Sequence, residues 1–236
     1  MKPLNPKTDL ATIQQICAAL DYSMALTPDA ATKMVREACG HARRYLFAAV
    51  PVFPHHIELA SQLLEGSCVA VQLALGFPSG GADAKVKAYE AEVGIEKGAT
   101  EVDMVMNIGR FIEKDYTYVE SEIRRVVEIA KQKQIGVKVI IEAGYLSDGQ
   151  KRDAVELICS AGGEYVKTCT GFGPGKATLH DICLLYAQAN GRLKVKASGG
   201  VMALEDGLAF MEAGASRIAG RISMVQQLES LGLTSF

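Results

Sequence analysis

Short runs of apolar residues recur along the chain and alternate with stretches in which apolar and charged residues are mixed. The runs are rich in β-branched residues and nearly continuous in apolarity, as expected of parallel strands that are covered on their outer face. Such runs lie at 45–53, 68–78, 101–109, 136–144, 164–171, 193–200 and 216–220, and a shorter candidate lies at 20–24.

Between these runs, apolar residues recur three and four positions apart, which is the spacing of an amphipathic helix. Clear examples are 83–98, 115–134, 149–162 and 202–214, and the last two end in glycine, a common helix stop. Eight strands that alternate with helices predict an α/β fold of the (β/α)8 TIM-barrel class. An open doubly wound sheet is the rival fold, but no GxGxxG follows the first strand and no P-loop is found.

Length and composition agree with one barrel. The chain has 236 residues and no Pro/Ser-rich linker or shift in composition, so residues 1–236 are expected to form a single domain. The formal net charge of −2 gives no electrostatic reason to expect nucleic acid or an anionic membrane as a partner. The first ten residues, MKPLNPKTDL, lack the apolar region of a signal peptide. We therefore expect a cytoplasmic protein without a membrane segment.

The cysteines and histidines show no spacing typical of a metal site. The cysteines, at 17, 39, 68, 159, 169 and 183, are expected to be small buried thiols in a reducing compartment. The histidines, at 41, 55, 56 and 180, form no ligand pattern, and the adjacent pair cannot easily share one ion from a regular element. The sequence therefore predicts no metal and no organic cofactor.

Charged residues lie within the predicted strands, close to the ends at which the active sites of barrels are found. Lysine is rarely buried, because removing an ammonium group from water costs several kcal/mol unless a partner compensates. If alternate residues point inward, these groups converge in the barrel mouth, and Lys138 and Glu142 share one face. The residues are Asp103, Lys138, Glu142, Lys167 and Lys196.

Two lysines and an aspartate from three strands predict a specific chemistry, although each residue alone also has a structural explanation. Desolvation and mutual repulsion both disfavour the charged form of an amine, so one of Lys167 and Lys196 is expected to have a lowered pKa. A neutral amine attacks carbonyls and forms a Schiff base, whose iminium stabilises an adjacent carbanion. Asp103 is expected to transfer protons during the reaction.

Four motifs, EVDMVMNIG, KVIIEAGYLS, YVKTCTGFG and KVKASGGV, closely resemble those of the deoxyribose-phosphate aldolase family in their order and spacing. The resemblance is good over roughly residues 70–202. It implies a class I aldolase of TIM-barrel fold that cleaves 2-deoxy-D-ribose 5-phosphate to acetaldehyde and D-glyceraldehyde 3-phosphate. By the same resemblance, Lys167 forms the Schiff base, Lys196 perturbs it and assists proton transfer, and Asp103 belongs to the proton relay.

A phosphorylated substrate needs an anion site, which barrels often build from glycine N–H groups in the last loops. The segments TGFG and SGGV offer such backbone, with Thr170, Gly171, Gly199 and Gly200 as the candidate residues. Either glycine pair is equally compatible with an ordinary turn. The sequence therefore predicts a phosphate site here without fixing its atoms.

The chain departs from the family after its last strand. The family usually reads like RIGTSSG, whereas this chain reads RIAGRISMV. Arg221 follows Gly220 where a serine is expected, and Ser223 is the remaining hydroxyl of the stretch. A guanidinium holds phosphate or carboxylate equally well, so both anions remain open for the substrate.

The first strand also departs from the family, since DYSMALTP replaces a segment like DHTLLKP. Asp21 and Ser23 still match the aspartate and threonine of that motif and are predicted to bind substrate hydroxyls, but its lysine is missing. The alternatives are a Schiff-base aldolase for another aldol substrate and a non-catalytic barrel that binds sugar phosphates. A homodimer is possible, but the sequence shows no diagnostic interface.

Overall fold

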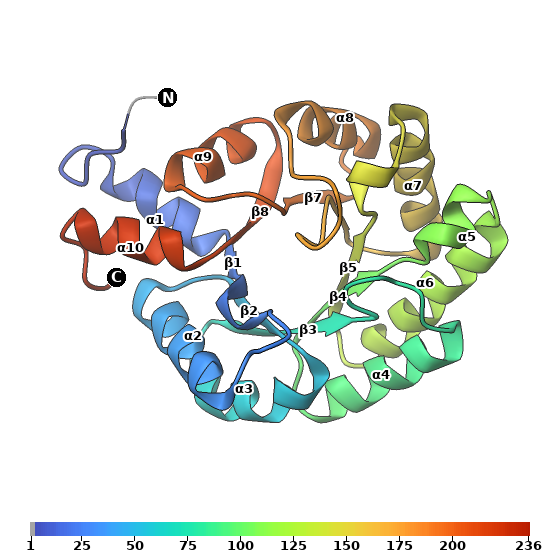
Figure 1. Ribbon diagram of the computed structural model, residues 1–236, viewed down its shortest axis with the longest axis horizontal. Helices are drawn as coiled ribbons and strands as arrows, with labels where there is room; N and C mark the ends of the chain where they lie inside the picture. The colour runs from blue at the N-terminus through green and yellow to red at the C-terminus, as the bar shows by residue number, and fades with distance from the viewer. Residues whose placement is uncertain (1–2) are drawn as a thin grey trace.

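The computed structural model describes residues 3–236 and shows eight parallel strands closed into a barrel, with helices around the outside (Figure 1). Each strand pairs with the next in the chain, and β8 pairs with β1. The predicted (β/α)8 fold is therefore confirmed. The strands are β1 (Leu20–Tyr22), β2 (Ala49–Val52), β3 (Ala70–Leu75), β4 (Glu101–Val105), β5 (Gly136–Ile140), β6 (Tyr165–Lys167), β7 (Lys194–Ala197) and β8 (Ala215–Gly220).

The helices cover the outer faces of the strands, and the four helical segments expected from apolar spacing correspond to α4, α6, α7 and α9. The helices are α1 (Leu10–Ala18), α2 (Thr32–Tyr45), α3 (Ile57–Leu64), α4 (Ala84–Glu96), α5 (Ile108–Ile112), α6 (Tyr116–Lys131), α7 (Asp148–Ala161), α8 (Leu179–Ala189), α9 (Leu204–Glu212) and α10 (Ile222–Ser230). Short 3₁₀ turns follow β1, β2 and β5.

Local sequence explains where the helices begin and end. Ser147 and Gln150 form a reciprocal capping box at the start of α7, and Gly162 ends this helix in the left-handed conformation. At the start of α4, Asp83 accepts a hydrogen bond from the backbone N–H of Lys85 at 2.8 Å. These caps satisfy backbone groups that a helix terminus otherwise leaves unpaired.

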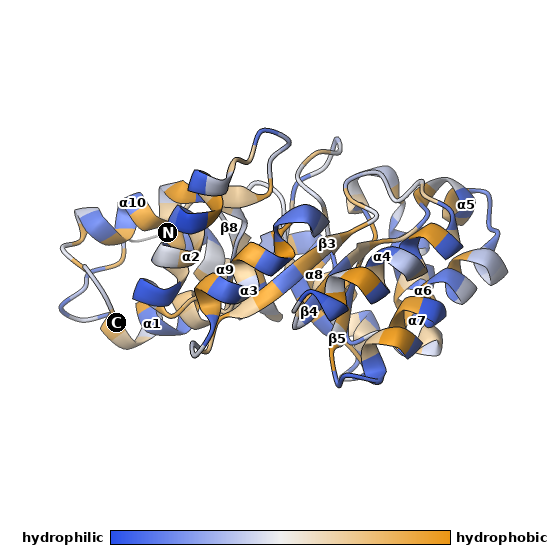
Figure 2. Cartoon of the chain, turned by 90° about the horizontal axis from the view of Figure 1, so that it is seen from below, coloured by the Kyte–Doolittle hydropathy of each residue, from blue (hydrophilic) through white to orange (hydrophobic). Residues whose placement is uncertain are grey.

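The apolar core lies between the outer faces of the strands and the inner faces of the helices, and Figure 2 shows hydrophobic and hydrophilic residues side by side on the same outer helices. A buried ion pair also lies in this layer. Lys87 of α4 donates to Glu122 of α6 at 2.9 Å and to the carbonyl of Val105 at 2.9 Å, and both charged side chains are fully buried. Together, these contacts join two helices to the end of β4.

The prediction that Lys138 and Glu142 share one face is wrong. Strand β5 ends at Ile140, and Glu142 has a φ of 47°, in the left-handed region. Strand alternation therefore stops before Glu142. Its carboxylate instead accepts hydrogen bonds from the backbone N–H of Thr170, at 3.1 Å, and from the Thr170 hydroxyl. Glu142 thus fixes the loop after β6 and does not join Lys138.

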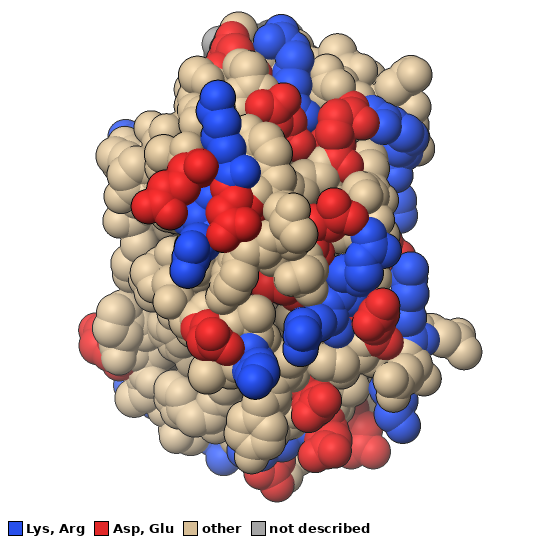
Figure 3. All heavy atoms as spheres, turned by 90° about the vertical axis from the view of Figure 1, so that its right-hand side faces the viewer, with Lys and Arg blue, Asp and Glu red and all other residues tan. Residues whose placement is uncertain are grey.

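Charges of both signs are mixed on the outer face shown in Figure 3, the right-hand side of Figure 1. On α6, Arg124 pairs with Glu120, and Arg110 of α5 lies 3.3 Å from Asp115.

Among residues 3–236, no helix is both long enough and apolar enough to cross a bilayer. All six cysteines are free, but the expectation of burial is wrong for Cys68 and Cys183, which are exposed.

Candidate active site

The strands bring Asp103, Lys167 and Lys196 together inside the barrel. Lys167 and Lys196 are register partners on β6 and β7, and Asp103 lies on β4. Both lysines donate to Oδ2 of Asp103, Lys167 from 2.7 Å and Lys196 from 2.6 Å. All three side chains are at most 3% exposed. The three predicted catalytic residues therefore form one buried cluster.

Lys196 and Asp103 also belong to a larger structure, a closed ring of alternating charges. In this ring each carboxylate contacts two cations and each cation contacts two carboxylates. The ring extends over β1, β4, β5, β7 and β8. Its members, in order, are Arg217, Asp21, Lys196, Asp103, Lys138 and Glu101, and Glu101 closes the ring on Arg217.

Lys167 lies outside this ring, and among the contacts of residues 3–236 it is attached to the ring through Asp103 alone. With three cations and three carboxylates, the ring has no net charge when all its members are ionised, so the ammonium of Lys167 is a surplus buried charge. Lys196 differs, because its ammonium contacts three acceptors: Asp103, Asp21 and Gln72. An ammonium has three N–H donors, so those of Lys196 are all used.

The pKa values follow from this arrangement. Burial lowers the pKa of Lys167 to about 8; Asp103 opposes this shift and Lys196 adds to it. Burial acts in the same direction on Lys196, but Asp103 and Asp21 outweigh it and raise its pKa. Burial alone would raise the pKa of Asp103, yet Lys167, Lys196 and Lys138 together lower it. Lys167 is therefore the lysine that loses its proton more readily.

A cavity of about 560 Å³ opens beyond the ends of β6, β7 and β8. Seven of the predicted substrate-binding residues line it: Ser23, Thr170, Gly171, Gly199, Gly200, Gly220 and Arg221. Two others do not. Asp21 is fully buried in the charged ring, and Ser223 donates to the backbone carbonyl of Met202 at 2.7 Å. The hydroxyl of Ser23 lies 3.4 Å from the carbonyl of Asp21.

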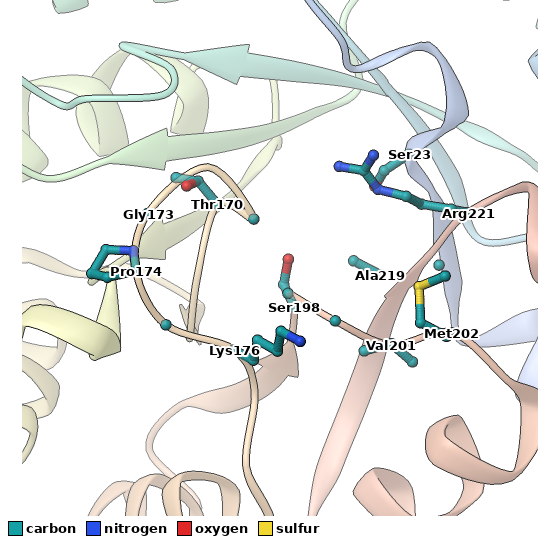
Figure 4. Close-up of a pocket in the computed structure, with 15 residues that line it drawn as sticks. Ser23, Thr170, Gly173, Pro174, Lys176, Ser198, Val201, Met202, Ala219 and Arg221 are labelled. Carbon is teal, nitrogen blue, oxygen red and sulfur yellow. The ribbon is translucent and has the colours of Figure 1, made fainter.

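Two cationic side chains flank this cavity. Figure 4 shows Arg221, beside Ser23, and Lys176 on different sides of it. A Cβ on Gly171 would lie 3.8 Å from Nη2 of Arg221, so the guanidinium reaches toward the loop after β6. Among residues 3–236, neither Lys176 nor Arg221 pairs with a carboxylate. This arrangement suits an anionic group.

Lys176 is held in place by the loop after β7. Its alkyl stem lies over Gly200, where an added Cβ would come within 2.9 Å of Cδ of Lys176. Gly200 also has a φ of 75°, so both its space and its backbone favour glycine. The next residue, Ala177, donates its N–H to the carbonyl of Gly199 at 2.9 Å. The two loops therefore form one wall of the cavity.

Several residues of the site were not singled out from the sequence. Glu101 and Arg217 could have been found from strand alternation. Glu101 lies two positions before Asp103 on β4, and Arg217 lies two positions before Ala219 on β8, so each shares the inward face of its strand. Gln72 is uncharged and gives no such signal. Lys176 follows a Gly/Pro-rich loop, so its position depends on a backbone path that alternation does not describe.

Outside the barrel, Asp148, His180 and Asp181 form a cluster on α7 and α8, with ligand-type atoms within 4.8 Å of one another. No spacing in the sequence predicts this grouping. Lys151 lies within it, 2.6 Å from Asp181 and 3.3 Å from Asp148. The two carboxylates therefore already have a cationic partner.

Comparison with known proteins gives a consistent result, although no protein-family model matches the chain. The deoxyribose-phosphate aldolase of Clostridium perfringens is 44% identical over 211 residues, or 89% of this chain and 93% of that protein. That of Caldanaerobacter subterraneus subsp. tengcongensis is 40% identical over 225 residues, or 94% and 97% of the two chains. The tetrameric deoxyribose phosphate aldolase from Aeropyrum pernix has a TM-score of 0.85 at 31% identity and matches 94% and 93% of the two chains.

Proposed function

The chain belongs to the deoxyribose-phosphate aldolase family and is a carbon–carbon lyase, and we propose that Lys167 forms the Schiff base with its substrate. The substrate we propose is 2-deoxy-D-ribose 5-phosphate, and the products are acetaldehyde and D-glyceraldehyde 3-phosphate. The observation that carries the assignment of Lys167 is its position as the surplus cation beside a neutral ring of charges.

The first steps of the mechanism use the neutral amine. Nζ of Lys167 attacks the aldehyde carbon of the open-chain sugar, and the carbinolamine loses water to give an iminium ion. The iminium accepts the electron pair of the breaking C2–C3 bond, while the C3 hydroxyl loses its proton and becomes the aldehyde of the first product. The resulting enamine is protonated at C2, and hydrolysis releases acetaldehyde and regenerates Lys167.

Asp103 is suited to move protons in these steps. Its Oδ2 is 2.7 Å from Nζ of Lys167, so protons leaving or returning to this nitrogen have an acceptor at hydrogen-bond distance. Its Oδ1 is buried and, within the described residues, has no hydrogen-bond partner. Lys196 remains charged throughout and favours the neutral form of Lys167 by repulsion.

The anionic end of the substrate is assigned to the cavity beyond β6, β7 and β8. There the backbone of Gly171, Gly199 and Gly200 and the side chains of Lys176 and Arg221 line the same cavity. Two cations that have no carboxylate partner within the described part of the chain, together with bare glycine backbone, favour a phosphate dianion. The cavity adjoins the charged cluster, since Ser198 follows Lys196 by two residues and lines the cavity.

Trapping with borohydride tests this assignment directly. The protein is incubated with acetaldehyde, reduced with sodium borohydride and digested, and the modified residue is located by mass spectrometry. We expect a single N-ethyl group on Lys167. A modification on Lys196, or none at all, would contradict the proposed mechanism.

A different aldol substrate is a second candidate, favoured by the two cationic side chains at the cavity. Arg221 and Lys176 are also able to hold a carboxylate, since a guanidinium matches the geometry of both anions. Rates with phosphorylated, carboxylated and uncharged aldols separate the candidates. A preference for a carboxylated aldol would replace the proposed substrate and leave the role of Lys167 intact.

We also propose that residues 1–236 act as one catalytic domain in the cytoplasm and that the chain forms a homodimer. The Aeropyrum pernix protein is described as a tetramer, and we therefore expect that the present chain also associates with copies of itself. Light scattering of the purified protein tests the dimer, and a mass equal to one chain would contradict it.

A further inference from the structure

Gln72 of β3 is a neutral side chain within the buried charged cluster. It is fully buried, and both ends of its amide are engaged. Its Oε1 accepts a hydrogen bond from Nζ of Lys196 at 3.0 Å. Its Nε2 donates to Oδ2 of Asp21 and to Oε2 of Glu101, both at 2.9 Å. Since a lysine only donates and a carboxylate only accepts, these partners fix the orientation of the amide.

These three hydrogen bonds connect Gln72 to three members of the ring, of which Asp21 and Glu101 are not adjacent. Asp21 and Glu101 contact the same arginine, Arg217, and Gln72 joins the two carboxylates a second time from β3. Through Lys196, Gln72 also reaches Asp103, the carboxylate that holds Lys167. Gln72 therefore braces the ring, in the sense that it holds three of its members in place by hydrogen bonds.

The charge of residue 72 contributes to the net charge of the whole cluster. Because the amide is neutral, the ring has as many cations as carboxylates, and the ammonium of Lys167 is in excess. A carboxylate at the same place would add one negative charge and would balance that excess. In a buried site this change favours the charged form of the amine.

We propose that Gln72 is a positioning residue for the Schiff-base reaction, whose neutral amide braces the charged ring without changing its net charge and so leaves Lys167 as the surplus cation. This inference rests on the proposed function of Lys167. Gln72 acts through Lys196 and the carboxylates.

The charged groups around Lys167 and Gln72 come from five strands, whereas β2, which pairs with the strand of Gln72, has no charged residue. Asp21 lies on β1, Asp103 and Glu101 on β4, Lys138 on β5, Lys196 on β7 and Arg217 on β8. Tyr165 of β6 also adjoins the ring, with its ring centre 5.3 Å from Nζ of Lys138 and 5.3 Å from Nζ of Lys194. Lys194 is exposed, so water screens its charge.

The test measures how the rate of borohydride trapping of the acetaldehyde adduct depends on pH. The midpoint is the pH at which this rate is half its maximum, and it is compared between variants that change the charge of residue 72 and variants that do not. Gln72→Glu should move the midpoint of trapping upward by about one pH unit, because the added carboxylate stabilises the ammonium of Lys167. Gln72→Met keeps the charge, so its midpoint should stay within about 0.3 pH units of the wild type while its turnover falls roughly tenfold. An unchanged midpoint in Gln72→Glu, or equal shifts in both variants, overturns the inference.

A complementary pair of variants covers the case in which Gln72→Glu does not fold. Glu101→Gln removes one negative charge from the same ring, so its midpoint should move downward; no downward shift overturns the inference. In the double variant Q72E/E101Q the charge count returns to that of the wild type, and so should the midpoint. Thermal unfolding of each protein verifies that it is folded before its profile is measured.

Failure of this inference is distinguishable from failure of the proposed function. The wild-type protein is trapped first, and an N-ethyl group on Lys167 establishes the Schiff base independently of Gln72. If that adduct forms and the midpoints of the variants do not move, only the role of Gln72 is wrong. If no adduct forms, the proposed function itself is wrong.

Discussion

Lys167 and Lys196 donate hydrogen bonds to one and the same oxygen atom, Oδ2 of Asp103. Two ammonium groups around one carboxylate oxygen repel each other, and burial adds to the cost of both charges. What separates them is a second carboxylate: Asp21 contacts Lys196 and does not contact Lys167. This difference drives their pKa values in opposite directions. Lys196 therefore keeps its proton and its charge, whereas Lys167 can lose its proton.

The first prediction concerns the pH profile of the wild-type protein. Schiff-base formation needs the neutral amine, whose fraction falls as the pH drops below the pKa of Lys167, about 8. The trapping rate should therefore rise about tenfold per pH unit up to roughly pH 7.5 and level off above pH 8. Single-turnover trapping between pH 5.5 and 10 measures this, and an inflection near the ordinary pKa of lysine would contradict it.

A second prediction follows from repulsion between the two lysines. In Lys196→Met the neighbouring cation is gone and Asp103 is left mainly to Lys167, so the pKa of Lys167 should rise toward its ordinary value. The trapping midpoint should move upward by about one pH unit, and trapping at pH 7 should slow roughly tenfold. A midpoint at or below that of the wild type would disagree with the assigned role of Lys196.

A third prediction isolates the nucleophile. Lys167→Ala should lose at least about 10⁴-fold in aldol cleavage while keeping its fold, because the covalent route is closed. Lys194→Ala is the matched control, since Lys194 is the exposed lysine at the start of the neighbouring strand β7. Steady-state rates and circular dichroism of both variants provide the comparison. Normal turnover by Lys167→Ala would exclude the mechanism.

A fourth prediction concerns the anion site. Lys176→Ala and Arg221→Ala should each raise the KM for 2-deoxy-D-ribose 5-phosphate by roughly 10- to 100-fold, because each removes a charge-assisted hydrogen bond to phosphate. The KM for unphosphorylated 2-deoxyribose should change less than about twofold. Lys33→Ala on α2, an exposed lysine away from the cavity, serves as control. Equal effects on both sugars would show that the two residues do not bind phosphate.

A fifth prediction concerns stability. Lys87 is also a fully buried lysine, and burial lowers its pKa too, but it pairs with Glu122 between two outer helices. Lys87→Met leaves the Glu122 carboxylate buried without its cation, at a cost of about 3–5 kcal/mol, and should lower Tm by roughly 10 °C. The double variant Lys87→Met/Glu122→Leu should recover most of that loss. Calorimetry at pH 7 provides the values, and an additive loss in the double variant would contradict the pairing.

The contrast between Lys87 and Lys167 shows how far the sequence could lead. The barrel was predictable because apolar runs and amphipathic segments alternate along the chain. Lys167, Lys196 and Asp103 were conspicuous because charges inside apolar strands need a reason. Lys87 was not conspicuous, since an amphipathic helix is expected to carry lysines. It is the packing of α4 on α6 that buries this side chain.

The rest of the site depends on backbone geometry that residue patterns do not encode. Glu142 leaves the face predicted by strand alternation because its φ is in the left-handed region. Lys176 reaches the cavity only because a glycine-rich loop returns over Gly200. Gln72 carries no charge, so nothing in its strand sets it apart until the register brings it beside Lys196.

The ring of charges closes between β8, which supplies Arg217, and β1, which supplies Asp21. These are the last and first strands of the barrel, so a nascent chain completes the ring only after residues 215–220 have left the ribosome and paired. Without Arg217 the ring has three carboxylates and two cations, so its net negative charge would balance the ammonium of Lys167. The nucleophile therefore depends on the last strand of the barrel, and a fragment that ends before β8 should form less of the acetaldehyde adduct at neutral pH.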